Sequence, residues 1–212
     1  MRRTLAKARR DNVLLGSLLV MTLIGVAGGG VNLLVPLQLR ADGLSAGATG
    51  LAMSGSAVVF LLSSALIAGR ARAVSLRVVA IAALLYGGSM LLAAGDTSAA
   101  TMIAFVLLRS PFWAALSTLA YPLAALGAVR AAVGRGAVNG LLNLAWGAAG
   151  SAGPVMAGAL AQAVGRPWVF AALAAACSGV GVSLLATDST ARPLQRELRS
   201  APANPCCEKG RW

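Results

Sequence analysis

Residues 12–39 read NVLLGSLLVMTLIGVAGGGVNLLVPLQL and contain no charged residue. A helix needs about 20 apolar residues to cross a hydrocarbon core about 30 Å thick, so this run is long enough to span a membrane. It follows a basic stretch that ends at Arg10. A signal peptide shares that arrangement, but its apolar region is about half as long. The run therefore predicts a retained membrane anchor.

Five further apolar runs follow the first one. The six runs cover residues 12–39, 46–68, 78–94, 99–129, 136–164 and 167–186. They predict an all-α fold, a polytopic membrane bundle of six transmembrane helices. The chain then divides into a basic cytoplasmic N-terminus (1–11), a six-helix transmembrane domain (12–187) and a cytoplasmic tail (188–212). The tail is polar and proline-rich, which predicts disorder.

The composition agrees with a membrane protein and excludes several classes of function. Hydrophobic residues make up 58% of the chain and charged residues 11%, whereas soluble domains carry roughly a quarter charged residues. The chain has no histidine, which excludes Ser-His-Asp nucleophiles and His-ligated zinc or haem. The sequence predicts no catalytic residue, metal or cofactor, and therefore not an enzyme. The basic residues lie in clusters between apolar runs, so nucleic acid is not expected as a partner.

The distribution of Lys and Arg predicts the orientation. Fifteen of the 18 lie in the N-terminal stretch, the second loop, the fourth loop or the tail, which share one side of an even-numbered bundle. The opposite side holds only Arg40 and Arg166. By the positive-inside rule, both termini are cytoplasmic in a multi-pass protein of the cell membrane.

Polar side chains within the apolar runs are the candidates for function. All six acidic residues lie in loops, helix ends or the tail, so no carboxylate of the kind that proton pumps use is expected in the bilayer. Arg109 lies about ten residues into its helix, or about 15 Å deep. Such an arginine faces the bundle or a cavity; alternatively the helix starts later and Arg109 snorkels to the interface.

Three helices carry stripes of small or polar residues at helical spacing. The stripes comprise Gly25, Gly28, Gly29, Asn32 and Pro36 on the first helix, Arg109, Ser110, Trp113, Ser117 and Tyr121 on the fourth, and Asn139, Asn143, Trp146 and Gly150 on the fifth. Small residues more often mark a packing face than a pathway. The mixture of Asn, Trp and Tyr is harder to explain by lipid contact. Packing and cavity lining are both open interpretations for the fifth helix.

Three sequence patterns resemble the major facilitator superfamily. On the fifth helix, Gly140-x8-Ala149-x3-Gly153-Pro154-x2-Ala157-Gly158 resembles the family's antiporter motif, with alanine in place of two glycines. The second loop, Ala65-Leu-Ile-Ala-Gly-Arg70-Ala-Arg72, resembles the signature Gly-x-Leu-Ala-Asp-Arg, with Gly69 in place of its Asp. Ser110-Pro-Phe-Trp113 through Asn143-Leu-Ala-Trp146 resembles the tenth and eleventh helices of actinobacterial members. The resemblance covers about residues 12–186.

The resemblance implies one six-helix half of a twelve-helix transporter, most similar to the C-terminal half, whose degenerate loop signature usually looks like this one. Such halves enclose the substrate path between them, so the chain is expected to pair with a second half, to self-associate or to be part of a truncated transporter. The resemblance implies cavity-lining roles for Asn32, Ser56, Arg109, Tyr121, Asn139, Asn143 and Trp146. It gives Gly140, Ala149, Gly153, Pro154, Ala157 and Gly158 a helix-packing or hinge role, and Arg70 and Arg72 a cytoplasmic loop role.

Close backbone approach at the small residues of the fifth helix, and a bend at Pro154, also follow from the residues themselves. The first hypothesis for function is transport of a small organic solute or drug across the lipid bilayer. The second is a non-transporting integral membrane subunit, such as a sensor or assembly factor. An intramembrane enzyme is a distant third, because its acid and base groups would be limited to Tyr, Ser and Cys.

Overall fold

A computed structural model of the chain describes residues 11–70, 75–96 and 98–200, with the backbone alone for residues 70 and 188–200. These residues form six α-helices and no strand. The helices are α2 (Asn12–Ala41), α3 (Ala46–Arg70), α4 (Leu76–Gly95), α5 (Ala99–Arg130), α6 (Arg135–Val164) and α7 (Arg166–Ser200). The all-α prediction is therefore confirmed for the described part of the chain.

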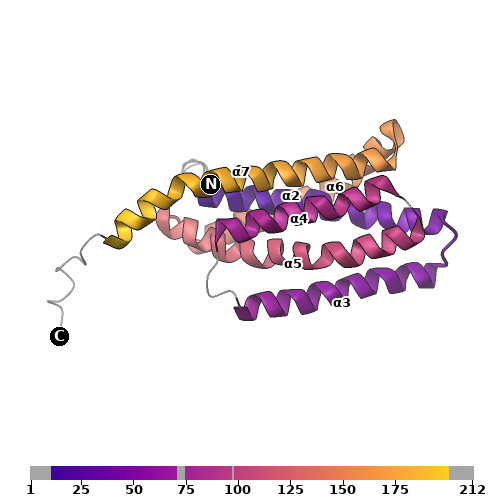
Figure 1. Cartoon of the computed structure of the whole chain (residues 1–212), viewed down its shortest axis with the longest axis horizontal. Helices are drawn as coiled ribbons and strands as arrows, with labels where there is room; N and C mark the ends of the chain where they lie inside the picture. Colours follow the sequence, from indigo (N-terminus) through magenta and orange to yellow (C-terminus); the bar gives the residue numbers. More distant parts are fainter. Residues whose placement is uncertain (1–10, 71–74, 97, 201–212) are drawn as a thin grey trace.

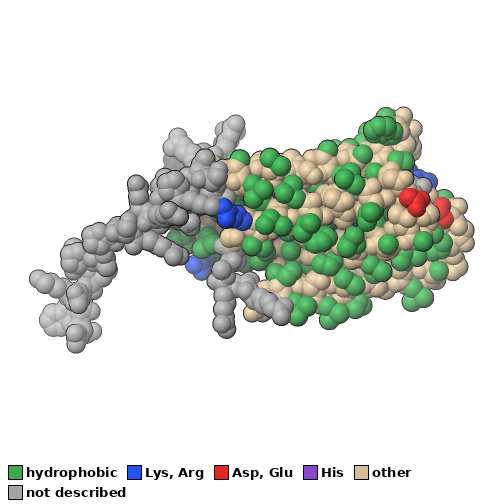
Figure 2. All heavy atoms as spheres, in the orientation of Figure 1, with side chains coloured by type: hydrophobic (Ala, Val, Ile, Leu, Met, Phe, Trp, Pro, Cys, Tyr) green, Lys and Arg blue, Asp and Glu red, His purple; other side chains and the backbone are tan. Residues whose placement is uncertain are grey.

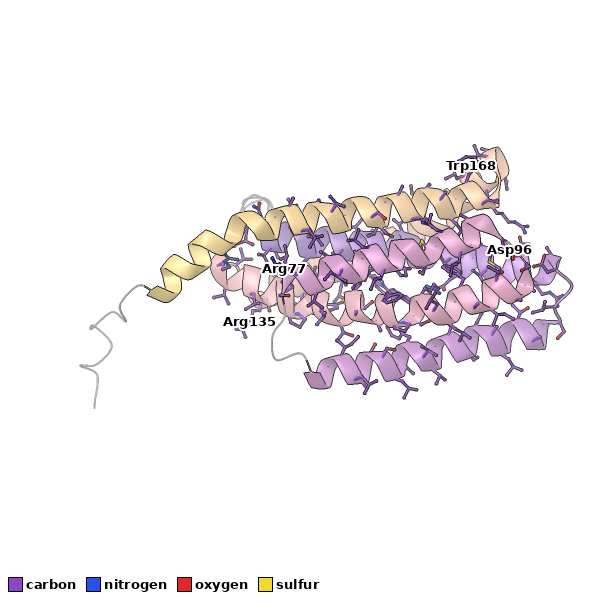
Figure 3. The ribbon with its side chains drawn as sticks, viewed as in Figure 1. Arg77, Asp96, Arg135 and Trp168 are labelled. Carbon is purple, nitrogen blue, oxygen red and sulfur yellow. The ribbon has the colours of Figure 1, made fainter. Side chains whose placement is uncertain are left out.

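Successive helices run in opposite directions along the long axis of the molecule (Figure 1). The first residues of α2, α4 and α6 consequently lie at one end, and the first residues of α3, α5 and α7 lie at the other (Figure 1). Arg77 and Arg135 lie at the first end, and Asp96 and Trp168 lie at the second (Figure 3). Charged side chains gather at the two ends and apolar ones cover the flank between them (Figure 2).

Five of the six described helices are long and apolar enough to cross a membrane. They are α2, α3, α4, α5 and the part of α7 from Arg166 to Thr187. The helix α6 is as long as α2, at 30 residues, but it is not in this set. Asn139, Asn143, Ser151 and several glycines lower its hydropathy. The five helices indicate a membrane-spanning protein.

The helix α2 lies at the centre of the packing. It contacts α6 and α5 extensively, while α4 packs against α7 and α5. The helix α3 packs mainly against α5 and lies at the edge of the bundle (Figure 1). Its side chains are largely uncovered, and Leu51 is 75% exposed. In a bilayer, lipid covers such a face.

The α2–α6 contact depends on glycines that let the two backbones approach closely. A Cβ atom added at Gly29 would lie 2.6 Å from the carbonyl oxygen of Gly150, and one added at Gly153 would lie 2.5 Å from that of Val26. Ordinary contact begins at about 3.4 Å. Small residues permit this approach in membrane helices, where packing drives association.

The backbone of α7 continues to Ser200, beyond residue 188, where the sequence predicted a disordered tail to begin. The sequence LQRELRS at residues 194–200 contains several good helix formers, which favour a helix after the apolar part ends at Thr187, although Pro193 opposes it. The basic stretch 1–10 and the tail from 201 lie outside the described residues.

Candidate functional site

A pocket of about 370 Å³ lies between α2, α5 and α6. Two tryptophans, five glycines and three other residues line it: Ile24, Gly25, Gly28, Gly29, Asn32, Trp113, Trp146, Gly147, Gly150 and Ser151. They come from the middle of the three helices, and a bilayer core would therefore surround the pocket at mid-depth. We call it the α2–α5–α6 pocket.

The glycines and tryptophans give this pocket its shape. Gly25 and Gly29 let α6 approach α2 closely. A Cβ atom added at Gly28 would lie 3.5 Å from the Trp113 ring. Gly147 has open space where a side chain would be. Trp146 is 48% exposed. The result is an aromatic wall beside a nearly side-chain-free surface, a combination suited to an apolar or planar solute.

Polar groups lie at and around the pocket. Asn32 is exposed and lines it, and Ser151 donates its hydroxyl hydrogen to the Gly147 carbonyl at 3.0 Å. On the same side of the bundle, the Tyr121 hydroxyl donates to Oδ1 of Asn143 at 2.5 Å, which joins α5 to α6. Tyr121 is partly buried and Asn143 is exposed. These amides would face hydrocarbon if nothing covered the pocket.

Arg109 lies behind this pocket and does not line it. Its side chain is 1% exposed and is among the largest that the bundle buries. Its Nη2 donates to Oδ1 of Asn32 at 3.4 Å, and its guanidinium carbon lies 5.0 Å from the centre of the Trp113 ring and 5.9 Å from that of Phe105. Arg109 therefore faces the bundle interior, and snorkelling to an interface does not describe it.

Ser56 is buried in a helix–helix contact. Ser110 donates its hydroxyl hydrogen to the Val106 carbonyl at 2.6 Å. The single hydroxyl hydrogen of Ser56 then goes either to Oγ of Ser110 at 2.8 Å or to the same carbonyl at 3.1 Å. These bonds tie the peripheral α3 to α5. The structure thus gives Ser56 a packing contact, and it is not part of the pocket.

The remaining candidate residues divide between the α2 contact and the open face of α6. Ala149, Gly153 and Ala157 are buried, and Gly158 lies in ordinary contact with Leu33. Pro154 lies inside α6, and its Cδ would be 2.8 Å from a Cβ at Gly29.

Two further candidates, Gly140 and Asn139, are exposed. Gly140 has no atom near its missing side chain, so any close approach there would involve another molecule. The backbone of Arg70 ends α3, and Arg72 lies outside the described residues.

Tyr86 was not among the residues singled out in the sequence. It is fully buried in α4, and its hydroxyl lies within electrostatic and hydrogen-bonding reach of Arg109, although no contact there has full hydrogen-bond geometry. A single tyrosine between Leu85 and Gly87 gives no periodic signal, so only the pairing of α4 with α5 reveals it. Trp113, which belonged to the predicted stripe, has a buried Nε1 that lacks a hydrogen-bond partner.

A second cavity, of about 570 Å³, lies along α6 and α7 and reaches α2 through Val26. Only apolar side chains and Gly153 line it, so it offers no group that could orient a solute. Nowhere in the described residues do three His, Cys, Asp or Glu side chains gather as metal ligands would. The α2–α5–α6 pocket is therefore the candidate site.

Comparison with models of protein families, with curated proteins and with solved structures finds no match to this chain.

Proposed function

We propose that the chain moves a small organic solute across the cell membrane as one six-helix half of a transporter similar to the major facilitator superfamily. The α2–α5–α6 pocket is the observation that supports this proposal. It has both polar and apolar lining residues and lies at the middle of three long helices. Solute sites of secondary transporters lie near the bilayer midplane. The pocket has the depth, aromatic wall and polar groups that such a site requires.

The pocket has one wall in this chain, and a second wall is required. Asn143 and Trp146 are exposed beside it. The Oδ1 of Asn143 accepts from Tyr121, but an N–H group that meets hydrocarbon without an acceptor costs several kcal/mol. A second six-helix half, or a second copy of the chain, would cover these groups and enclose the solute.

In this proposal α6 is the sixth span. Its 30 residues give a length of about 45 Å, more than a hydrocarbon core of about 30 Å. The polar side of α6 would face the solute path and the second half. Its lower hydropathy is then explained, because that side would not contact lipid. With six spans, both termini lie on the cytoplasmic side, in agreement with the Lys and Arg asymmetry.

Counterflow exchange in proteoliposomes tests the proposal. The purified chain is reconstituted either alone or together with membrane proteins extracted from the cells that produce it. Each preparation is tested with a panel of radiolabelled organic cations, neutral compounds and anions. We expect exchange of at least one compound, lost in Gly147→Leu and retained in Gly140→Leu. Both glycines lie on α6 with open space at the missing side chain, but only Gly147 lines the pocket.

No exchange of any compound in either preparation would contradict transport and favour a non-transporting membrane subunit. Equal loss in both glycine variants would contradict the role of the pocket.

A further inference from the structure

Arg109 is a buried cation with almost no hydrogen-bonding partner. A guanidinium carries five N–H donors, but the structure gives Arg109 one long bond, from Nη2 to Asn32 at 3.4 Å. Its Nε and Nη1 are buried and have no partner. Unsatisfied buried donors are uncommon in native proteins and need an explanation, the more so on a charged group.

The described acidic side chains do not supply the missing partner. Asp11 caps the first turn of α2, where it accepts from the backbone N–H groups of Val13 and Leu14. Asp42 accepts from Gln38 at the other end of α2, and Asp96 accepts from its neighbours between α4 and α5. All three lie at helix ends, whereas Arg109 lies well within α5.

Aromatic rings account for part of the stabilisation of Arg109. Trp113 and Phe105 lie within 6 Å of its guanidinium carbon, and a desolvated cation–π contact contributes about 2 kcal/mol. The rings interact with the face of a guanidinium, while its N–H groups point outward in its own plane. The donors therefore stay available to an acceptor.

Two neutral groups lie next to the same guanidinium. The Trp113 Nε1 is buried without a hydrogen-bond partner and lies beside Arg109. The Tyr86 hydroxyl, which can donate or accept, lies within hydrogen-bonding reach of Arg109 but forms no bond of full hydrogen-bond geometry. Arginine and tryptophan nitrogens can only donate. A cluster with this excess of donors and a positive charge is chemically complementary to an oxyanion.

Asn32 connects this cluster to the pocket. Its carboxamide holds Nη2 of Arg109 and also lines the pocket, as does Trp113. A rotation of the Asn32 side chain would remove the neutral oxygen from Nη2 and leave the guanidinium next to the pocket. A carboxylate forms stronger bonds with a guanidinium than a neutral amide does.

We propose that the pocket binds a small organic carboxylate, whose oxygens replace Oδ1 of Asn32 on Arg109 and whose apolar body lies between Trp146 and the glycines of α2 and α6. The inference rests on the proposed function, because it names the solute class of the same pocket. A carboxylate has the planar shape that a guanidinium binds with two bonds. The glycine and tryptophan lining suits an organic body better than an inorganic ion.

The test measures binding of benzoate, benzamide and inorganic phosphate to the full chain in nanodiscs, by quenching of tryptophan fluorescence. Benzamide has nearly the shape of benzoate without its charge. We expect saturable benzoate binding at least tenfold tighter than that of benzamide or phosphate. Arg109→Gln weakens benzoate binding at least tenfold. Arg109→Lys keeps the positive charge but loses the planar pair of donors that binds a carboxylate, and it weakens binding less. Gly147→Leu abolishes binding, and Gly140→Leu leaves it unchanged.

Equal affinity for benzoate and benzamide overturns the carboxylate site and leaves the solute pocket standing. Absence of benzoate binding, tighter binding of phosphate, or benzoate binding that survives Arg109→Gln also overturns it. The comparison of benzoate with benzamide uses the unmodified chain, so the proposal stays falsifiable if Arg109→Gln fails to fold. Transport itself is judged separately by counterflow of the whole panel of cations, neutral compounds and anions.

Discussion

Replacement of Gly153 by alanine tests the packing that forms the pocket. The added Cβ would lie 2.5 Å from the Val26 carbonyl oxygen, where ordinary contact begins at about 3.4 Å. The shortfall is roughly 0.9 Å, and the opposing atoms belong to the backbone of α2, which cannot rotate away as a side chain could. The helices α2 and α6 must therefore move apart, and overpacking of this kind costs about 1–3 kcal/mol.

The free energy of unfolding, measured in bicelles with a denaturing detergent, should fall by about this amount for Gly153→Ala. Gly140→Ala is the matched control, because it makes the same chemical change on the same helix where no atom lies within 4 Å. We expect it to leave stability unchanged or to raise it slightly, since alanine favours a helix more than glycine does. Equal stability of the two variants would refute the close α2–α6 contact.

Three further predictions concern topology, the attachment of α3 and pH. Reporter fusions after Arg130 and after Gly95 should report opposite sides of the membrane, and the same side for both would contradict the alternating helix directions. Ser56→Ala removes the hydroxyl that hydrogen-bonds to α5, and a hydrogen bond in a membrane protein contributes about 0.6 kcal/mol on average. The amide hydrogens of α3 should therefore exchange faster in micelles, and unchanged exchange would argue against this link between α3 and α5. Hydrogen bonds from Thr101 and then Ser98 lower the pKa of Asp96. The stability that these bonds give the folded chain is therefore fully present above the ordinary carboxyl pKa near 4, and it is lost as the pH falls through the lowered pKa. Carboxyl NMR should find that lowered pKa, and Thr101→Val should move it back up.

The helices could be predicted from the sequence because apolar runs alternate with charged loops. The predicted starts at residues 46 and 99 coincide with those of α3 and α5. The position of Arg109 about ten residues into its helix also followed from the sequence, since α5 starts at Ala99. These features depend on local sequence alone, since a helix must satisfy its own backbone in a membrane.

The arrangement of the helices could not be predicted in the same way. Which helix covers Arg109 depends on long-range packing, and Tyr86 becomes relevant only because α4 packs against α5. Ser56 was expected to line a cavity, but it lies in hydrogen-bonding contact with Ser110. The sequence could not distinguish the two, because a single serine in an apolar helix looks the same in either setting. Gly140 and Gly153 belong to one motif and only Gly153 packs tightly, because spacing along a helix does not say which neighbour it meets.

The central claim is that the α2–α5–α6 pocket is a solute path that water enters. A single cysteine in a chain otherwise free of cysteine tests it, by its rate of reaction with a membrane-impermeant thiol reagent. Ser151→Cys is a conservative change that lines the pocket, and Leu61→Cys is its control on the exposed outer face of α3. Both positions lie near the middle of their helices. We predict a reaction at least tenfold faster at Ser151 than at Leu61, because thiolates form in water and not in hydrocarbon. Equally slow reaction at both positions would contradict a solute path and make the pocket a lipid-filled packing defect.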